Sequence, residues 1–286
     1  MNDHRLTVIM PLRNYEGRFL RKAVESILQQ TCPSWRLLIV VEPAELEAFR
    51  TLLRDETKDP RVGIIINRGH RLAGAINSAL RSATSEYVAL LLSDDLWSTD
   101  AVEILNGYIA RYPDVDFFHS SRRYIDETGN FISSVYASRD ALGLEDFRFG
   151  PVKHLLCWRR SKALSIGGLD ESLSSLVGPD DYDFPWTMAE HGATFKTIPE
   201  CLYYYREHCE CYRLTTHTPL MVNLREVARI LKKHRVGFWG RTQRLTQLWL
   251  NSRIGSPYLY RSTLDKWITD RLGYDVRRRW KPIRFK

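Results

Sequence analysis

Two short acidic stretches carry the residue types best suited to chemistry in this chain. Ser93-Asp94-Asp95 follows the apolar run from Tyr87 to Leu92, and Asp180-Asp181-Tyr182-Asp183 precedes a helix-like segment. An apolar run that ends in carboxylates is typical of a buried parallel strand, which delivers them to the sheet edge where open α/β folds bind ligands. Carboxylate oxygens suit Mg²⁺ or Mn²⁺, the usual partners of a diphosphate. The pattern predicts a metal-assisted site, although Asp also forms turns after strands and caps helices.

A diphosphate bound here would lack the usual glycine-rich cradle. Neither a dinucleotide-binding turn nor a P-loop follows the first strand-like run, residues 6–10. The charge of a diphosphate would then have to be met by a metal and by cations, for which Asp94, Asp95 and Arg71 are the candidates. Arg71 has an equally common alternative role as a solvated residue at the start of a helix.

The first half of the chain alternates between strand-like and helix-like segments. Strand-like runs cover residues 6–10, 35–41, 62–66 and 87–92, and helical spacing covers residues 19–30, 44–53 and 72–83. This alternation predicts an α/β fold with a mostly parallel sheet, right-handed crossovers and helices on both faces. Beyond a helix over 101–112 and a strand over 115–120, residues 126–130 resemble a β-hairpin turn. A helix over 182–191 and strands over 194–198 and 202–205 should form a second half packed on the first.

Charge is divided unevenly along the chain. The formal charge is +8, but residues 221–286 hold 17 Lys or Arg against 4 Asp or Glu, which leaves −5 for residues 1–220. The basic segment is rich in tryptophan, and this combination favours peripheral binding to an anionic membrane surface. A solvated helical face or a subunit interface is as compatible with it, whereas the acidic body argues against nucleic acid as a partner.

Cysteine usage and hydropathy bear on the compartment. No apolar stretch of 18 residues and no secretory leader is found, so we expect a cytoplasmic protein, peripheral on the cytoplasmic face of the membrane. Five cysteines, an odd number, argue against a disulfide framework and fit a reducing compartment. His208, Cys209, Cys211 and His217 lack the paired C-x₂-C spacing of structural zinc sites, so zinc is not expected there.

Several motifs occur in the order found in a known family. They are the opening segment Thr7–Pro11 with Asn14 and Ala23–Thr31, then Asn67 with Gly69, Ala73 and Asn77, then Leu91–Asp95, Gly167–Asp170, Asp180–Asp183 and Tyr204–His208. Together they resemble the family 2 glycosyltransferases of the GT-A fold over about residues 5–210. The resemblance implies a GT-A domain over residues 1–218, with a nucleotide-sugar half to about 120 and an acceptor half over 121–218. Residues 219–286 would form a basic, helical extension.

The resemblance implies an inverting displacement at the anomeric carbon of a nucleotide diphosphate sugar, with a UDP-sugar favoured. The acceptor would be a hydroxyl of a glycan or of a lipid-linked oligosaccharide. Asp181 occupies the position of the base that takes the acceptor proton, and its alternative role is that of a helix cap. Asp180 and Trp186 would lie on the acceptor side. Asp94, Asp95 and His208 would bind Mn²⁺ or Mg²⁺, although His208 could instead be a structural histidine at a strand end. Nucleotide-sugar contacts would come from Pro11, Arg13, Glu42, Asn67, Arg71, Ser93 and Asp94.

Departures from the family pattern keep two other functions open. Val41-Glu42-Pro43-Ala44 stands where Asp-Asp-Gly-Ser is usual, so Glu42 would replace the Asp that contacts the base. The D-x-D motif is Leu92-Ser93-Asp94, which keeps only the last carboxylate, and Arg13 stands where Tyr is common. A sugar nucleotidyltransferase is one alternative, although Arg13–Gly17 is a poor version of its glycine-rich loop. A catalytically inactive carbohydrate-binding protein on the same fold is the other.

Overall fold

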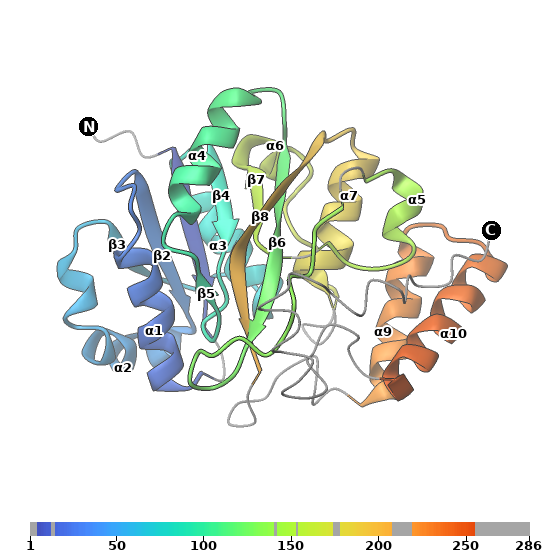
Figure 1. Cartoon of the computed structure of the whole chain (residues 1–286), viewed down its shortest axis with the longest axis horizontal. Coiled ribbons are helices and arrows are strands. Elements are labelled where there is room, and N and C mark those ends of the chain that lie inside the picture. Colours follow the sequence, from blue (N-terminus) through green and yellow to red (C-terminus); the bar gives the residue numbers. More distant parts are fainter. Residues whose placement is uncertain are drawn as a thin grey trace.

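The computed structural model describes residues 5–12, 15–139, 142–152, 154–173, 178–207 and 219–254, the last four by their backbone. The first half follows the predicted alternation of strands and helices (Figure 1). Its elements are β1 (Leu6–Pro11), α1 (Gly17–Leu28), β2 (Trp35–Val41), α2 (Leu46–Leu52), β3 (Val62–Ile66), α3 (Arg71–Ser82), β4 (Tyr87–Leu90), β5 (Leu96–Trp97) and α4 (Ala101–Arg111), with short 3₁₀ turns at Pro43–Glu45 and Glu56–Lys58.

The second half adds antiparallel pairs to this sheet. Its elements are β6 (Phe117–Ile125), α5 (Leu144–Phe147), β7 (Leu156–Arg159), α6 (Arg160–Ser165), a π-helical turn at Pro179–Asp183, α7 (Phe184–Glu190), β8 (Phe195–Arg206), α9 (Leu220–Lys233) and α10 (Phe238–Ile254). The strand order is β3-β2-β1-β4-β7-β6-β8-β5. Strands β1 to β4 pair in parallel, β7 runs antiparallel to β4 and β6, and β6 and β8 pair in parallel. The expected mostly parallel α/β sheet is confirmed.

Two segments differ from the expected elements in detail. The strands expected over 194–198 and 202–205 are one strand, β8, whose register with β6 shifts around Ser121. The expected turn at 126–130 is present, because the Asp126 side chain accepts hydrogen bonds from the backbone N–H groups of Thr128, Gly129 and Asn130. Beyond this turn the chain returns to β6 through isolated bridges rather than as a continuous strand.

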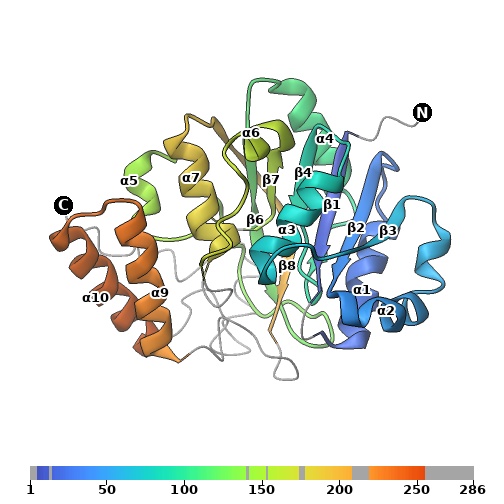
Figure 2. The same cartoon turned by 180° about the vertical axis from the view of Figure 1, so that it is seen from behind.

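Two apolar clusters cover the two faces of the sheet. Helices α1, α2 and α4 contribute to one cluster, and α3, α6 and α7 contribute to the other. Figures 1 and 2 show these helices on opposite sides of the strands. The hairpin of α9 and α10 extends the second layer, because Val227, Ile230 and Leu231 belong to the same cluster as Phe184 and Trp186. The basic extension therefore begins as part of the core rather than as a separate body.

Candidate active site

Asp94 lies in the turn that follows β4, at the C-terminal edge of the parallel strands. Three hydrogen bonds from β8 hold this turn: Tyr203 donates its hydroxyl to Asp95 Oδ2 at 2.7 Å, the backbone N–H of Arg206 donates to Asp95 Oδ1 at 2.7 Å, and Arg206 Nε donates to the Asp94 carbonyl at 2.8 Å. Asp95 is fully buried, whereas Asp94 and Ser93 are half-buried. Contrary to the sequence-based expectation of a metal ligand, Asp95 fixes the turn, which leaves Asp94 as the metal candidate of the two.

Arg206 is a site residue that the sequence reasoning missed. Its guanidinium also donates to the carbonyls of Asp126 and Glu127 and lies 4.8 Å above the ring of Phe19. Burial lowers the pKa of Arg206, while the charges of Asp95 and Asp94 oppose that shift. Arg206 thus links the Asp94 turn to the turn at 126–130 and to α1. The signal available in the sequence was a lone arginine at the end of an aromatic strand.

Three of the predicted nucleotide-binding residues meet at the ends of β2 and β3. Asn67 Nδ2 donates to Glu42 Oε1 at 3.0 Å and to the carbonyl of Arg71 at 3.2 Å. Arg71 begins α3 with a left-handed φ of 58° and is exposed. Pro11 ends β1 beside Val40 and is buried, whereas Arg13 lies outside the described residues. The structure therefore assembles a polar edge from β1, β2 and β3 next to the Asp94 turn.

The second acidic stretch forms a π-helical turn at the start of α7. Gly178 precedes it with a φ of 53°, and a Cβ there would lie 2.7 Å from that of Tyr182, so the turn needs glycine. The Asp181 carbonyl accepts a 2.8 Å hydrogen bond from the N–H of Val152. Asp181 is half-buried, whereas Asp180 is only 6% exposed. The motif thus presents Asp181 rather than Asp180 at the surface.

Asp180 and Asp181 lie in different electrostatic surroundings. Burial, and then the charge of Asp181, raise the pKa of Asp180 to about 8. Asp181 lies near Arg122, where its charge and those of nearby tyrosines raise the pKa of the guanidinium against the effect of burial. Asp180 therefore favours its protonated form at neutral pH.

The two acidic stretches are connected through two buried rings. Tyr203, which binds Asp95, stacks on His154 with ring centroids 5.2 Å apart. His154 Nε2 lies 3.6 Å from Asp180 Oδ2, which is close for an ion pair but long for a hydrogen bond. A chain of contacts through Tyr203 and His154 therefore links Asp95 to Asp180. Neither ring was identified from the sequence.

Trp186 and Asp183 point away from this edge. Trp186 is 4% exposed, and its indole stacks on His234 at 4.2 Å. Contrary to the acceptor-side expectation, its side chain belongs to the core between α7 and α9. The carboxylate of Asp183 is paired with Lys233 and His234 of the α9 end.

Of the three predicted metal ligands, only Asp94 and Asp95 lie within the described residues. His208, Cys209, Cys211 and His217 lie outside the described residues, and no group of three or more metal-binding side chains occurs among those described. Arg206 donates a hydrogen bond to the Asp94 carbonyl, and Glu207 and His208 follow Arg206 directly in the sequence. The half-buried carboxylate of Asp94 is thus the described oxygen donor that suits a divalent metal.

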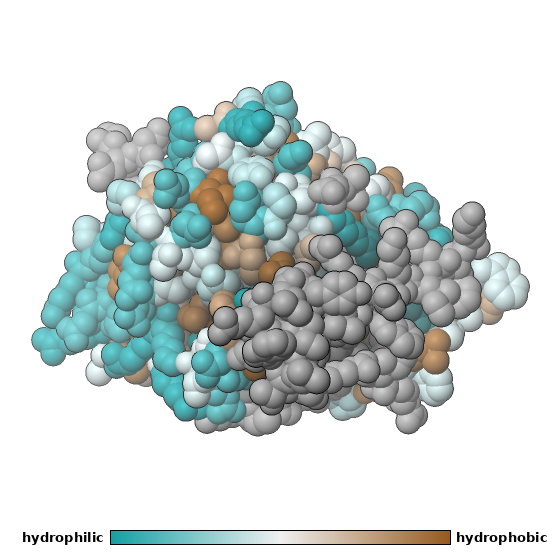
Figure 3. Space-filling model, viewed as in Figure 1, coloured by the Kyte–Doolittle hydropathy of each residue, from teal (hydrophilic) through white to brown (hydrophobic). Residues whose placement is uncertain are grey.

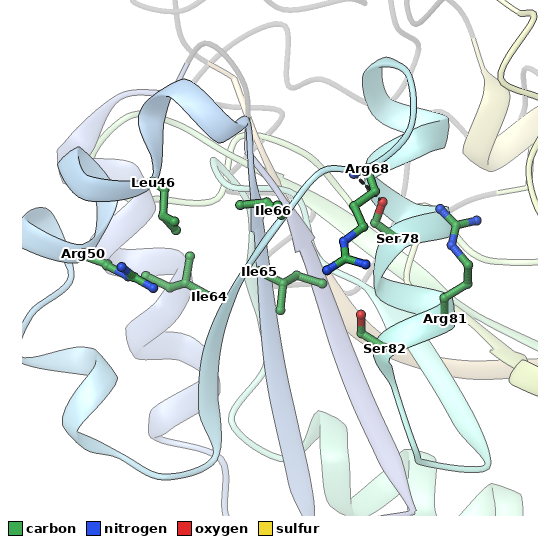
Figure 4. Close-up of a pocket in the computed structure, with 9 residues that line it drawn as sticks. All are labelled: Leu46, Arg50, Ile64, Ile65, Ile66, Arg68, Ser78, Arg81 and Ser82. Carbon is green, nitrogen blue, oxygen red and sulfur yellow. Dashed lines mark hydrogen bonds between the residues drawn. The ribbon is translucent and has the colours of Figure 1, made fainter.

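A separate cavity of about 430 Å³ opens at the outer edge strand β3 (Figure 4). Its lining contains none of the predicted site residues and consists of Leu46, Arg50, Ile64, Ile65, Ile66, Arg68, Ser78, Arg81 and Ser82. Charged side chains beside an exposed, isoleucine-rich edge strand are a common protection against edge-to-edge aggregation. We therefore assign no role in the site to this cavity.

Solved structures with the same architecture share little sequence identity with this chain. TarS from Staphylococcus aureus, solved with UDP-GlcNAc, aligns with a TM-score of 0.59 at 14% identity, covering 86% of this chain and 71% of that one. The mannosyltransferase PcManGT from Pyrobaculum calidifontis, solved with GDP-Man and Mn²⁺, aligns with a TM-score of 0.56 at 18% identity, covering 96% and 82%. These likenesses confirm the GT-A fold.

Two sequence relatives agree with the fold. An uncharacterised glycosyltransferase of Methanocaldococcus jannaschii is 27% identical over 218 residues, which is 72% of each chain. A UDP-Glc:alpha-D-GlcNAc-diphosphoundecaprenol beta-1,3-glucosyltransferase of Escherichia coli is 32% identical over 106 residues, 36% of this chain and 40% of the relative. The model of glycosyl transferase family 2 matches residues 7–158, more than half of the sequence. The chain therefore belongs to glycosyl transferase family 2, as its motifs had indicated.

Proposed function

We propose that this glycosyltransferase moves a sugar from a nucleotide diphosphate sugar, with a UDP-sugar favoured, to a hydroxyl group of a glycan or lipid-linked acceptor. The observation that carries the proposal is the convergence of the Asp94 turn and the Asp181 turn through Tyr203 and His154. Solved neighbours hold UDP-GlcNAc or GDP-Man, and one relative acts on a diphosphoundecaprenol-linked sugar. Both facts support a nucleotide-sugar donor and a surface-glycan acceptor.

The donor end of the site is assigned to Asp94, Asn67, Glu42 and Arg71. Glu42 and Asn67 would contact the nucleoside, and the exposed Arg71 would face the diphosphate. Asp94 and His208 are the residues that would hold Mn²⁺ or Mg²⁺. A divalent ion bound there would stabilise the charge that grows on the departing nucleoside diphosphate.

The acceptor end is assigned to Asp181. Asp181 would take the proton of the acceptor hydroxyl while the oxygen attacks the anomeric carbon and the bond to the diphosphate breaks, with inversion. Burial, and then the charge of Asp181, raise the pKa of Asp180 to about 8, so at neutral pH Asp180 adds no second negative charge beside the proposed base.

Donor hydrolysis is the direct test of the proposal. We expect Mn²⁺-stimulated release of nucleotide from at least one of UDP-glucose, UDP-N-acetylglucosamine, UDP-glucuronate and GDP-mannose, measured by coupled detection of UDP or GDP. The same nucleotide should raise the melting temperature, because a ligand at a hundredfold excess over its Kd contributes about 2.7 kcal/mol. A chain that neither binds nor cleaves any of these donors would contradict the proposal.

We further propose that the turn between α9 and α10 attaches the enzyme to an anionic membrane. Phe238 and Trp239 are 65% and 82% exposed, with ring centroids 5.4 Å apart, and Arg235 is exposed in the same turn. Residues 219–254 contain eight Lys or Arg and one acid, Glu226. In Figure 3, the face over α1 and α2 is mostly hydrophilic, whereas pale and brown side chains gather over α10. Within the described chain, no helix is both long and apolar enough to span a bilayer.

Vesicle co-sedimentation tests this attachment. We expect binding to phosphatidylglycerol vesicles in 50 mM salt that weakens strongly in 500 mM salt, because aromatic insertion and lysine or arginine attraction act together. Phe238→Ser with Trp239→Ser should weaken it about tenfold by removing the inserted rings. Trp249→Ser, on the same helix and 43% exposed, is the matched control and should bind normally. Binding that is absent at low salt or indifferent to salt would exclude the membrane as partner.

A further inference from the structure

The last turn of α9 binds both carboxylate oxygens of Asp183. Lys233 Nζ lies 2.8 Å from Asp183 Oδ2 and 2.8 Å from Asp170 Oδ2, and His234 Nε2 lies 3.0 Å from Asp183 Oδ1. The side chains of Asp183 and His234 are each 1% exposed. Burial alone would lower the pKa of Lys233, but hydrogen bonds to Asp170 and Asp183 outweigh it and raise that pKa. Lys233 is therefore a charged bridge between three segments of the chain.

His234 contacts residues in the first turn and at the last position of α7. Its ring stacks on the indole of Trp186 at an angle of 4°, and its Nδ1 lies 3.0 Å from Glu190 Oε1, although without hydrogen-bond geometry. From α10, the buried guanidinium of Arg244 lies 5.9 Å from the ring of Tyr182. The hairpin thus contacts the π-helical turn, the first turn of α7 and its last residue.

These contacts bear on Asp181 because Asp183 belongs to the same turn. A buried carboxylate is stable only when it is paired and hydrogen-bonded, so the orientation of the turn depends on the groups that pair with Asp183. A displacement of about 1 Å at a reacting group can cost about a hundredfold in rate. Lys233 and His234 can thus determine the orientation of Asp181 without contacting a substrate.

We propose that Lys233 and His234 are positioning residues that orient the catalytic turn from the C-terminal hairpin, an inference that rests on the function proposed above for Asp181. Nucleotide binding, which is assigned to the opposite end of the site, does not depend on them. If the proposal is right, losing these contacts lowers turnover but leaves donor binding unchanged. If their role were purely structural, turnover and donor binding would fall together, because less of the protein would be folded.

Lys233→Met is the central variant, and Lys232→Met is its matched control. Lys232 is exposed, lies one residue away on α9 and makes no ion pair within the described chain. We expect Lys233→Met to lower kcat for nucleotide release from the best donor of the panel by at least tenfold, with Kd for UDP and Mn²⁺ within twofold of the wild type. Lys232→Met should leave both quantities unchanged.

Rescue and coupling distinguish positioning from general damage. Lys233→Arg keeps a cation between Asp170 and Asp183 and should restore most of the turnover. Asp183→Asn should lower kcat to a similar extent, and the double variant with Lys233→Met should be no slower than the worse single variant, because both remove the same contact. His234→Gln, which keeps a donor, should be milder than His234→Leu.

Amide hydrogen exchange gives a readout that does not require turnover. Lys233→Met should accelerate exchange over residues 179–187 and leave β1 and β2 protected. The inference about the hairpin would be overturned, with the proposed function left intact, if Lys233→Met were as active as an active wild type. An equal loss of turnover and of UDP binding in Lys233→Met would have the same meaning. A wild type that releases no nucleotide from any donor would overturn the proposed function and with it this role of the hairpin.

Discussion

Replacing Asp181 by Asn is expected to reduce sugar transfer and donor hydrolysis by about 10²- to 10⁴-fold, the range typical for removal of a general base. The substitution keeps the size of the side chain and removes only its ability to take a proton. Nucleotide binding should persist, since Glu42, Asn67 and Asp94 lie on other loops. Steady-state kinetics with UDP binding measured by calorimetry would show kcat falling while Kd stays near the wild-type value.

Asp180→Asn is the informative comparison. The pKa of Asp180 is raised to about 8, so below that pH the side chain already carries its proton and Asn imitates it. We therefore expect Asp180→Asn to keep most of its activity at pH 7, with any difference from the wild type growing as the pH rises through 8. Equal losses in Asp180→Asn and Asp181→Asn at pH 7 would show that the base has not been identified.

Asp94→Ala should have the second-largest effect, a loss of metal-dependent activity of about a hundredfold or more. The reason is that Asp94 is the described carboxylate best placed to hold a divalent ion beneath the diphosphate. The decisive measurement is Kd for UDP with and without Mn²⁺: the wild type should bind more tightly with Mn²⁺, and the variant should show no such gain. Chelation with EDTA should bring the wild type to the level of the variant.

The Asp95→Ala variant distinguishes metal binding by Asp94 from structural support of the turn by Asp95. It leaves the Tyr203 hydroxyl and the Arg206 N–H without their acceptor, and each unsatisfied buried donor costs about 1–3 kcal/mol. We expect a lowered melting temperature as its main effect. A coupling between Mn²⁺ and UDP that survives in Asp94→Ala and is lost in a folded Asp95→Ala would assign the metal to Asp95 instead.

The nucleotide half was predictable because its signals are local. Three of the four apolar runs between Leu6 and Leu92 mark strands that are largely buried, and carboxylates that follow parallel strands lie at the same edge of the sheet. The place of Asp94 at this edge follows from that pattern, whereas the strand order β3-β2-β1-β4 was not predicted. The family motifs supplied the roles that geometry alone does not give.

The acceptor half depends on contacts between distant residues, which periodicity does not reveal. Trp186 was expected to face a substrate, but the ring of His234, far along the chain, covers it. The side chain of Asp183 pairs with Lys233 and His234, which lie 50 and 51 residues further along the chain. Strand β8 continues through Pro199 because its register against β6 shifts there. From the sequence, a proline at this position predicts the end of a strand.

Asn77 joins the two halves in a way that limits how the enzyme can respond to its donor. From α3 its side chain donates to the carbonyl of Leu169 at 2.9 Å and accepts from the N–H of the same residue at 2.8 Å. A Cβ at Gly168 would overlap the Asn77 side-chain oxygen, so the approach is tight. Glu171 adds bonds to Asn77 and to the N–H of His70. With one sheet running through both halves as well, these bonds oppose a hinge rotation between them, and we expect the two halves to respond to a donor as one unit.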